Sequence, residues 1–392
     1  MGYEPLAWRR AMKVQQVILK ALSGEMKWFE AAEVLGLSPR SLRRWRTRMK
    51  LRGYEGLLDR RRKTPSPRRA PMGQVQRILR LYRTKFKDFN VLHFHQIATT
   101  EHRITLSYSF VKKALQEAGL VTKRRSRGRH RLRREPRGCL GEMLHLDGSR
   151  HAWLKLLPEA KQTLIAVIDD ATSWVLYAQL EEAESTQTVM AAIHATITKN
   201  GLPAALYTDR ASWAFYTPKA GEPIDKDKLT QLGRALRQLG IEHIPAYSPQ
   251  ARGRSERLNL TLQDRLVNEL GLRGIRTREA ANRYLNSHFL PRHNKTYARE
   301  PRENTSAFVP LGNTDLDQFL CHEETRVVGK DNTVVLGRVR LQISKQPGRQ
   351  SCQGLNVVVR RHIDGRHSIW LGKKLLGSYD SCGKVAQTSH AA

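Results

Sequence analysis

Residues 144–149 of the chain read LHLDGS, an alternation of apolar and polar side chains that is typical of a half-buried β-strand. A continuous apolar run follows at Leu164–Ile168, and the residues DDAT at 169–172 supply a turn. Residues 174–180, WVLYAQL, then return as a partner strand. The sequence therefore predicts a hairpin-built sheet whose first strand carries Asp147 within it.

Helical and extended segments alternate after this hairpin. Residues 185–199 carry apolar side chains at helical spacing, and Gly201 is a typical helix end. Residues 204–208 form a short apolar strand, and Asp209 follows it directly. A second acidic side chain is therefore expected at the end of a strand.

The pattern continues toward a third acidic residue. Residues 241–246 predict a further strand, and a long helix is expected from about Ser255, with Glu256 in its first turn. The order strand–strand–strand–helix–strand–helix–strand–helix is typical of an α/β domain. Such a domain allows Asp147, Asp209 and Glu256, which are remote in sequence, to meet at one edge of the sheet.

Three carboxylates on rigid elements are typical of a site for hard divalent cations. Mg²⁺ prefers oxygen ligands and keeps positions for water and phosphate oxygens. Two such ions, roughly 3.5–4 Å apart, can hold the attacking and leaving oxygens of a phosphodiester. The acidic residues therefore indicate metal-assisted chemistry on a phosphate.

The chain carries a large excess of positive charge. Its 392 residues include 69 Lys and Arg against 36 Asp and Glu, a formal net charge of +33. Self-repulsion of this size opposes folding, and nucleic acid is the favoured partner because each neutralised phosphate releases a counterion. An anionic membrane is the alternative, but the longest apolar run, Leu164–Ile168, is far shorter than a membrane span.

The cysteines and the N-terminal residues indicate the cellular compartment in which the protein is expected. The four cysteines are widely spaced and form no CxxC pair, so reduced thiols are expected rather than disulfides or a zinc site. Basic residues interrupt positions 1–22, which therefore do not resemble a secretory signal. We expect a cytoplasmic protein.

Residues 28–45 read WFEAAEVLGLSPRSLRRW and predict a helix-turn-helix. Gly36 makes the turn, Ser38 is a good N-cap, and Pro39 fits the first helical position. The second helix exposes basic side chains that are expected to bind DNA: Arg40, Arg43, Arg44, Arg46 and Arg48. The alternative is a packing unit with a solvated basic face.

A second helical unit is expected at residues 72–120. Its last helix begins after Ser107, and Phe110 and Val111 are predicted to face inward. Contact with DNA and a packing role are both open for this unit. The basic runs at residues 60–69 and 123–137 predict linkers that lie near a polyanion.

The acidic motifs resemble those of one family, the retroviral-integrase-like DDE transposases of bacterial insertion sequences. The matching stretches are LHLDGS (144–149), LIAVIDDATSWVLYAQL (164–180), LYTDRAS (206–212), YSPQARGRSERLNLTLQDRL (247–266) and FLPRHNKTYAREPREN (289–304). The resemblance covers about residues 143–304, and the helical units precede it as the family's pattern requires.

This resemblance implies an RNase H-like integrase core with a mixed sheet. Asp147, Asp209 and Glu256 match the family's catalytic residues, which hold two Mg²⁺ or Mn²⁺ ions. The implied activity is cleavage at the ends of an insertion sequence and strand transfer of the freed 3′-hydroxyl into target DNA. The implied partners are the terminal inverted repeats and the target, both double-stranded DNA in the bacterial nucleoid.

Two consequences of the resemblance concern assembly and an alternative function. A homo-oligomer, a dimer or larger, is expected on DNA because two element ends must be processed together. The alternative is a catalytically inactive, DNA-binding regulator of transposition, since the helix-turn-helix and the charge suit both functions.

Two features depart from the commoner family pattern. Asp209 and Glu256 lie 256 − 209 = 47 positions apart, a longer interval than is common, and the extra residues fit a loop at about residues 213–227. The residues RAS at 210–212 stand where Asn-Gly is frequent. Both features resemble an insertion-sequence group often labelled ISNCY.

Other polar residues near the motifs have two interpretations. Asp169 and Asp170 are expected to be turn residues rather than metal ligands. The polar side chains around the start of the long helix are expected to contact DNA: Arg252, Arg254, Arg257, Asn259 and Gln263.

The C-terminal segment, residues 311–379, predicts short strands at 338–343, 356–361 and 368–371, and a small SH3-like β-barrel fits this pattern. A role in DNA or subunit contacts and a purely structural role are both open.

The predicted domains are a helix-turn-helix domain (1–60), a basic linker (61–71), a second helical DNA-binding domain (72–122), a second basic linker (123–140), the integrase core (141–304), the barrel (311–380) and a disordered tail (381–392).

Overall fold

The computed structural model describes residues 5–58, 70–123, 135–218, 224–225, 227–247 and 253–385. The chain divides into two compact units, Met1–Arg77 and Ile78–Ala392. Most of each predicted basic linker, and residues 386–392 of the predicted tail, lie outside the described residues. Within the described part, no helix combines the length and the apolar character needed to cross a membrane. All four cysteines are free thiols, as predicted.

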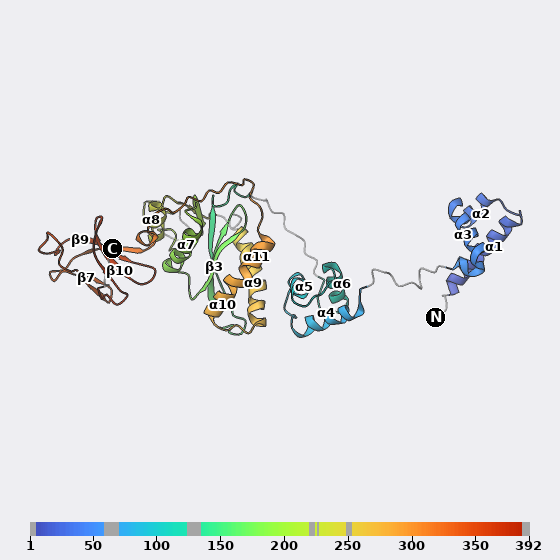
Figure 1. Ribbon diagram of the computed structural model, residues 1–392, viewed down its shortest axis with the longest axis horizontal. Helices are drawn as coiled ribbons and strands as arrows, with labels where there is room; N and C mark the ends of the chain where they lie inside the picture. The colour runs from blue at the N-terminus through green and yellow to red at the C-terminus, as the bar shows by residue number, and fades with distance from the viewer. Residues whose placement is uncertain are drawn as a thin grey trace. The chain divides into compact units, whose positions relative to one another are not determined.

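The described part of the first unit is helical (Figure 1). Its elements are α1 (Pro5–Leu22), α2 (Trp28–Val34), α3 (Pro39–Arg52) and the 3₁₀ turn η1 (Gly53–Leu57). Ile18, Ala31 and Leu42 lie in its core. Ser38 caps α3, since its Oγ accepts a hydrogen bond of 3.2 Å from the backbone N–H of Ser41. The predicted turn and cap of a helix-turn-helix are therefore present.

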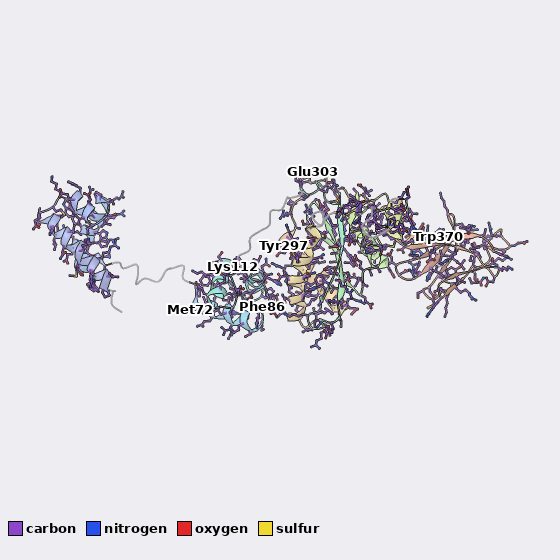
Figure 2. All side chains as sticks on the ribbon, turned by 180° about the vertical axis from the view of Figure 1, so that it is seen from behind. Met72, Phe86, Lys112, Tyr297, Glu303 and Trp370 are labelled. Carbon is purple, nitrogen blue, oxygen red and sulfur yellow. The ribbon has the colours of Figure 1, made fainter. Side chains whose placement is uncertain are left out.

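A second group of helices follows: α4 (Met72–Thr84), α5 (Val91–Thr100) and α6 (Tyr108–Glu117). Phe86, labelled in Figure 2, packs against Phe94 with 5.3 Å between ring centroids. The prediction that Phe110 faces inward is wrong, because its side chain is 38% exposed. Val111 and Leu115, four positions apart, form the buried face of α6, and Phe110 falls beside that face.

A five-stranded mixed sheet forms the centre of the second unit, in the order β3-β2-β1-β4-β5. Its strands are β1 (Leu144–His151), β2 (Gln162–Asp169), β3 (Val175–Glu181), β4 (Ala205–Thr208) and β5 (Glu242–Pro245). β1 pairs with β2 and β2 with β3 in antiparallel fashion, whereas β1 with β4 and β4 with β5 are parallel. The predicted order of strands and helices in this domain is confirmed.

Helices cover both faces of this sheet (Figure 1). One layer contains α7 (Thr186–Asn200) and α8 (Gln231–Gln238), and the other contains α9 (Gly253–Leu272), α10 (Arg278–Tyr284), the π-turn η4 (Leu285–Phe289) and α11 (Leu290–Tyr297). Leu144 and Leu146 of β1 pack in the α7–α8 layer. Because side chains alternate along a strand, Asp147 faces the α9 layer.

The C-terminal segment contains the short 3₁₀ turn η5 (Leu316–Gln318) and two open sheets. The larger sheet has the order β11-β10-β9-β6, from β6 (His322–Val327), β9 (Asn356–Arg361), β10 (His367–Leu371) and β11 (Lys374–Tyr379). β7 (Thr333–Leu336) and β8 (Val339–Gln342) form a separate hairpin. Trp370 of β10, labelled in Figure 2, lies under the Arg360 guanidinium at 4.9 Å.

The expected closed barrel is therefore not confirmed, although the predicted strands are present. No strand pairing joins the hairpin to the larger sheet in the described residues. The two sheets instead contribute side chains to one core, with Val334 and Leu341 from the hairpin and Val357 and Ile369 from the larger sheet. Side-chain burial, rather than a continuous hydrogen-bonded ladder, holds this segment together.

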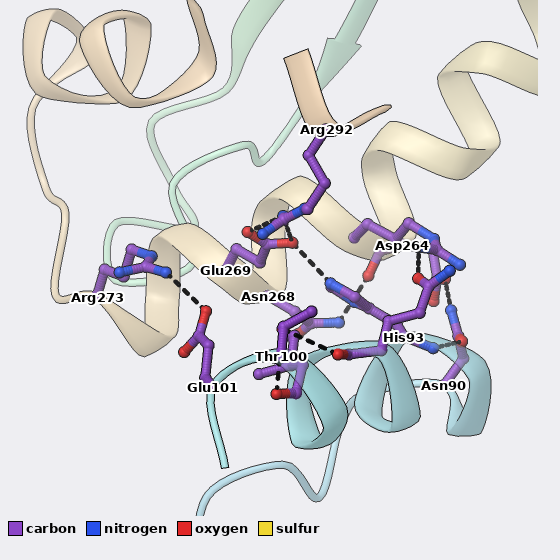
Figure 3. Close-up of polar contacts among 12 residues, drawn as sticks. Asn90, His93, Thr100, Glu101, Asp264, Asn268, Glu269, Arg273 and Arg292 are labelled. Atoms are coloured by element: carbon purple, nitrogen blue, oxygen red, sulfur yellow. Dashed lines mark hydrogen bonds and ion pairs between the residues drawn. The ribbon is translucent and has the colours of Figure 1, made fainter. Parts of the chain in front are cut away.

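The helical group α4–α6 contacts α9 through a buried polar cluster (Figure 3). His93 of α5 lies 2.7 Å from Glu269 of α9, measured from Nε2 to Oε1, and both side chains are at most 3% exposed. Arg292 and Tyr284 donate further hydrogen bonds to the same carboxylate. Of the two roles that the sequence left open for this helical group, a packing role is therefore observed.

Burial would raise the pKa of the Glu269 carboxyl, but hydrogen bonds from His93, Arg292 and Tyr284 lower it to about 2. A carboxyl whose pKa is lower in the folded state stabilises the fold above its ordinary pKa, near 4.5. This stabilisation is lost as the pH falls from there toward 2.

Replacing Glu269 with Gln is expected to lower the free energy of unfolding by about 3 kcal/mol at neutral pH, because the anion that three donors stabilise is removed. Urea unfolding of both proteins at a series of pH values measures this difference, which should shrink as the pH falls below about 4.5. The control is Glu101→Gln, which removes an exposed ion pair with Arg273 in the same interface and should cost at most about 1 kcal/mol. A difference that does not change with pH would contradict the assigned role of Glu269.

Candidate active site

Helix α9 lies over the polar side of β1. The Asn259 Nδ2 donates a hydrogen bond of 2.8 Å to Oδ2 of Asp147, and the Gln263 Nε2 donates one of 3.0 Å to Oγ of Ser149. Asp147 is 7% exposed. Asn259 and Gln263, which were predicted to contact DNA, are thus both engaged with β1 in this structure.

The parallel pairing of β1 with β4 makes the strand that carries Asp147 a neighbour of the strand that precedes Asp209. His145 pairs with Tyr207, and β4 ends one residue later, at Thr208. Asp209 is the first residue after β4, two positions beyond the last residue of β4 that pairs with β1. The Asp209 carboxylate accepts a hydrogen bond of 3.1 Å from the backbone N–H of Ala211.

Glu256 lies in the first turn of α9, three positions before Asn259, and its side chain is exposed. Residues three apart share a helix face, so Glu256 lies one turn along the helix from the contact with Asp147. Among the described residues, no three His, Cys, Asp or Glu side chains are gathered in an arrangement that could hold a metal ion. The three predicted acids therefore occupy neighbouring elements without forming a closed cluster.

The side chains around Asp147 suit a hard cation in their chemistry. The predicted ligands are all carboxylates, the oxygen donors that Mg²⁺ prefers. The Oδ1 of Asn259 is buried and has no hydrogen-bond donor among the described residues. This amide oxygen is therefore an unsatisfied acceptor beside a buried carboxylate. A cation bound at Asp147 would satisfy it.

Two further aspartates, Asp169 and Asp170, are completely buried at the turn after β2. Asp169 accepts hydrogen bonds of 2.8 and 2.7 Å from the backbone N–H and the hydroxyl of Thr172, as a turn-forming residue does. Asp170 lies 2.7 Å from Nε2 of His145 and 2.7 Å from Nε of Arg254. Both carboxylates are therefore engaged within the fold.

The Asp170–Arg254 ion pair connects the turn after β2 to the first turn of α9. Burial would raise the pKa of Asp170, but hydrogen bonds from His145 and the Arg137 backbone, with the charge of Arg254, lower it to about 2. Because Arg254 precedes Glu256 by two residues, this pair fixes the helix turn that carries Glu256. Sequence reasoning missed the contact, since no local pattern relates positions 170 and 254.

The remaining predicted DNA contacts differ in their surroundings. Arg254 was expected to meet phosphates, but its guanidinium contacts Asp170 and also Ser173. Arg257 is exposed, and Arg252 lies outside the described residues. The five arginines of α3 that were predicted to bind DNA are all exposed: Arg40, Arg43, Arg44, Arg46 and Arg48.

Comparisons with known proteins bear on both units. Residues 15–76 match the family described as "Winged helix-turn helix". The chain is 31% identical over 396 aligned positions to the putative transposase y4bF of Sinorhizobium fredii, covering 100% of this chain and 85% of that protein. It is 30% identical over 308 positions to the transposase for insertion sequence IS1202 of Streptococcus pneumoniae, covering 69% of this chain and 65% of that protein.

Similarities to solved structures are weaker. A chain of the simian T-cell lymphotropic virus intasome, solved with the PP2A regulatory subunit B56 gamma, aligns with 77% of this chain and 96% of its own, at 13% identity and a TM-score of 0.32. The HTLV-2 integrase catalytic core domain, solved with magnesium, aligns with 39% of this chain and 90% of its own, at 16% identity and a TM-score of 0.29. The family assignment therefore rests on the sequence matches.

The winged helix-turn-helix match indicates a DNA-binding protein. Because the first of these relatives aligns along the whole chain, the chain belongs to the family of transposases, as its sequence motifs led us to expect.

Replacing Arg254 with Gln is expected to lower the free energy of unfolding by about 3 kcal/mol, because it leaves the buried Asp170 carboxylate without its cationic partner. Urea unfolding followed by circular dichroism measures the change. Arg257→Gln, an exposed position on the same helix turn, serves as the control and should stay within about 0.5 kcal/mol of the wild type. Equal stability of the Arg254 variant and the wild type would show that the ion pair does not anchor α9.

Proposed function

We propose that the chain is a DDE transposase that cleaves DNA at insertion-sequence ends and joins them to target DNA. Asp147, Asp209 and Glu256 would hold two divalent cations, Mg²⁺ or Mn²⁺. The observation that supports this proposal is the parallel pairing of β1, which carries Asp147, with β4, which ends directly before Asp209. Helix α9, which carries Glu256 in its first turn, contacts Asp147 through Asn259. The unsatisfied Oδ1 of Asn259 next to Asp147 also supports it.

Different residues would hold the cations and position the catalytic side chains. When bound, a pair of divalent cations would stabilise negative charge on the attacking and leaving oxygens of the phosphodiester. Asn259 orients the Asp147 carboxylate through its amide N–H. The Asp170–Arg254 pair holds the first turn of α9, which carries Glu256, beside the turn that follows β2. No covalent bond between protein and DNA is needed.

DNA would be held mainly by exposed arginines. The arginines of α3 project from the second helix of the helix-turn-helix, which is the helix that enters the major groove in such units. The formal charge of +33 favours binding along the phosphate backbone. Because two element ends must be processed together, we propose that the active form is a dimer or a larger homo-oligomer on DNA.

A second candidate function is a catalytically inactive regulator that binds element ends. Two observations favour it: Glu256 is exposed, and the described residues contain no ready cluster of three metal-binding side chains. A transposase requires Glu256 to meet Asp147 and Asp209 when cations and DNA bind, whereas a regulator does not. Cleavage by the purified chain in the presence of Mg²⁺ distinguishes the two.

Replacing Asp147 with Asn is expected to lower cleavage and strand transfer by more than about 1,000-fold, because a ligand that carries several kcal/mol of charge stabilisation is lost. Binding of the element-end duplex should stay unchanged. The control is Glu279→Gln, an exposed acid at the start of α10, which should keep full activity. Full activity of the Asp147 variant would refute the assignment.

Replacing Arg44 with Gln is expected to weaken binding of duplex DNA and to reduce the slope of log affinity against log salt by about 1, because one phosphate contact is removed. Fluorescence anisotropy at several salt concentrations measures both quantities. A wild-type slope near zero would exclude a dominant contribution from the arginines of α3.

A further inference from the structure

A cavity of about 460 Å³ lies at the edge of the central sheet, between β5, the start of α8 and the segment after Asp209. This volume falls within the range of small-molecule and base-binding pockets, roughly 300–1,000 Å³. Six of its lining side chains are aromatic or basic, and two, Asp225 and Glu242, are acidic. The six are Phe215, Tyr216, Lys228, Arg237, His243 and Tyr247. All of these residues belong to the interval between Asp209 and Glu256, which is longer than is common in the family that the sequence resembles.

Flat aromatic surfaces dominate this lining. The Phe215 and His243 rings are stacked, with 4.0 Å between centroids and 20° between planes. Burial lowers the pKa of His243 to about 4, so its ring is neutral at physiological pH. Tyr216 and Tyr247 are 37% and 61% exposed at the rim. Rings at such an opening would be covered by a flat ligand that stacks on them.

Basic side chains lie over the two exposed rings. The Lys228 ammonium is 3.8 Å from the centroid of the Tyr216 ring, and the Arg210 guanidinium is 5.3 Å from that of Tyr247. Stacking of a nucleobase on an aromatic ring is stronger than an exposed cation–π contact. A base would therefore displace these cations from the ring faces, where they remain close enough to meet the adjoining phosphates.

The cavity is also connected to the candidate active site. Arg210 follows Asp209 directly, and the backbone N–H of Ala211 donates to the Asp209 carboxylate. The Thr230 hydroxyl donates a hydrogen bond of 2.9 Å to the backbone carbonyl of Ala214, which ties α8 to the segment after Asp209. A DNA strand lying at Asp209 would thus pass beside the rim of the cavity.

We propose that this cavity receives an unpaired base of the DNA strand that is bound at Asp147, Asp209 and Glu256. The inference rests on the proposed function and extends it by assigning a role to the described residues 214–216 and 228–247 of the long interval between Asp209 and Glu256. Removing a base from a duplex costs unstacking and unpairing energy, which is smallest where the DNA is already unpaired. The cavity should therefore favour frayed or mismatched ends over fully paired ones.

Photocrosslinking tests the location of the base without requiring catalysis. The full chain is mixed, in the presence of EDTA, with a duplex whose unpaired overhang contains 5-iodouracil, and the crosslinked peptide is identified by mass spectrometry. Crosslinks at Tyr216, Tyr247 or Phe215 are expected. Crosslinks found exclusively in other parts of the chain would overturn the proposal.

A matched pair of variants tests the stacking itself. Tyr216→Leu keeps an apolar side chain but removes the ring, and it should weaken binding of the unpaired overhang by about 5- to 150-fold. Tyr216→Phe keeps the ring and should bind as the wild type does. Equal affinities for all three proteins would overturn the proposal.

An abasic nucleotide at the crosslinked position provides the complementary test. It should weaken binding by the wild type as much as Tyr216→Leu does, and it should not weaken that variant further, since both changes remove one contact. Fully additive effects would contradict a direct stack of this base on Tyr216.

The outcomes separate this inference from the proposed function. If the wild type crosslinks through the cavity but does not cleave with Mg²⁺ or Mn²⁺, the cavity assignment stands and the catalytic proposal fails. If the wild type cleaves and Tyr216→Leu equals Tyr216→Phe in affinity and rate, the catalytic proposal stands and the cavity assignment fails.

Discussion

The packing of α9 across the polar side of β1 is the contact on which the arrangement of this protein depends. Asn259 and Gln263 bind Asp147 and Ser149, and Arg254 binds the buried Asp170. These contacts fix the helix both along its axis and in rotation about it. Since Glu256 lies on the same helix, its position over the sheet depends on polar pairing as well as on apolar packing.

The same helix receives contacts from distant parts of the second unit. Near its end, Glu269 is bound by His93 of α5, Tyr284 of α10 and Arg292 of α11. A buried carboxylate with three donors is far less costly than an isolated buried charge, and removing any one donor leaves that charge less well compensated. Helices α5 and α6 belong to the same compact unit as α9 and the central sheet.

Positive charge and aromatic surface are distributed differently over the molecule. The exposed arginines of α3 offer long-range, sequence-independent attraction to phosphates, which falls with salt. In the cavity at the edge of the central sheet, cations lie directly over aromatic rings, as Lys228 does over Tyr216. The first arrangement suits the outside of a duplex, and the second suits bases that are no longer paired.

The sequence by itself determined the order of the elements, the capped helix-turn-helix, the excess of positive charge and the positions of Asp147, Asp209 and Glu256. Such features depend on local periodicity, capping and composition, which short stretches encode. The tertiary structure alone decided that Asp170 pairs with Arg254, that Glu269 pairs with His93, that Phe110 is exposed and that the C-terminal sheets stay open. These outcomes depend on which surfaces pack together. Asp170 and Arg254 are 84 positions apart, and His93 and Glu269 are 176 apart, so no local pattern specifies either pair.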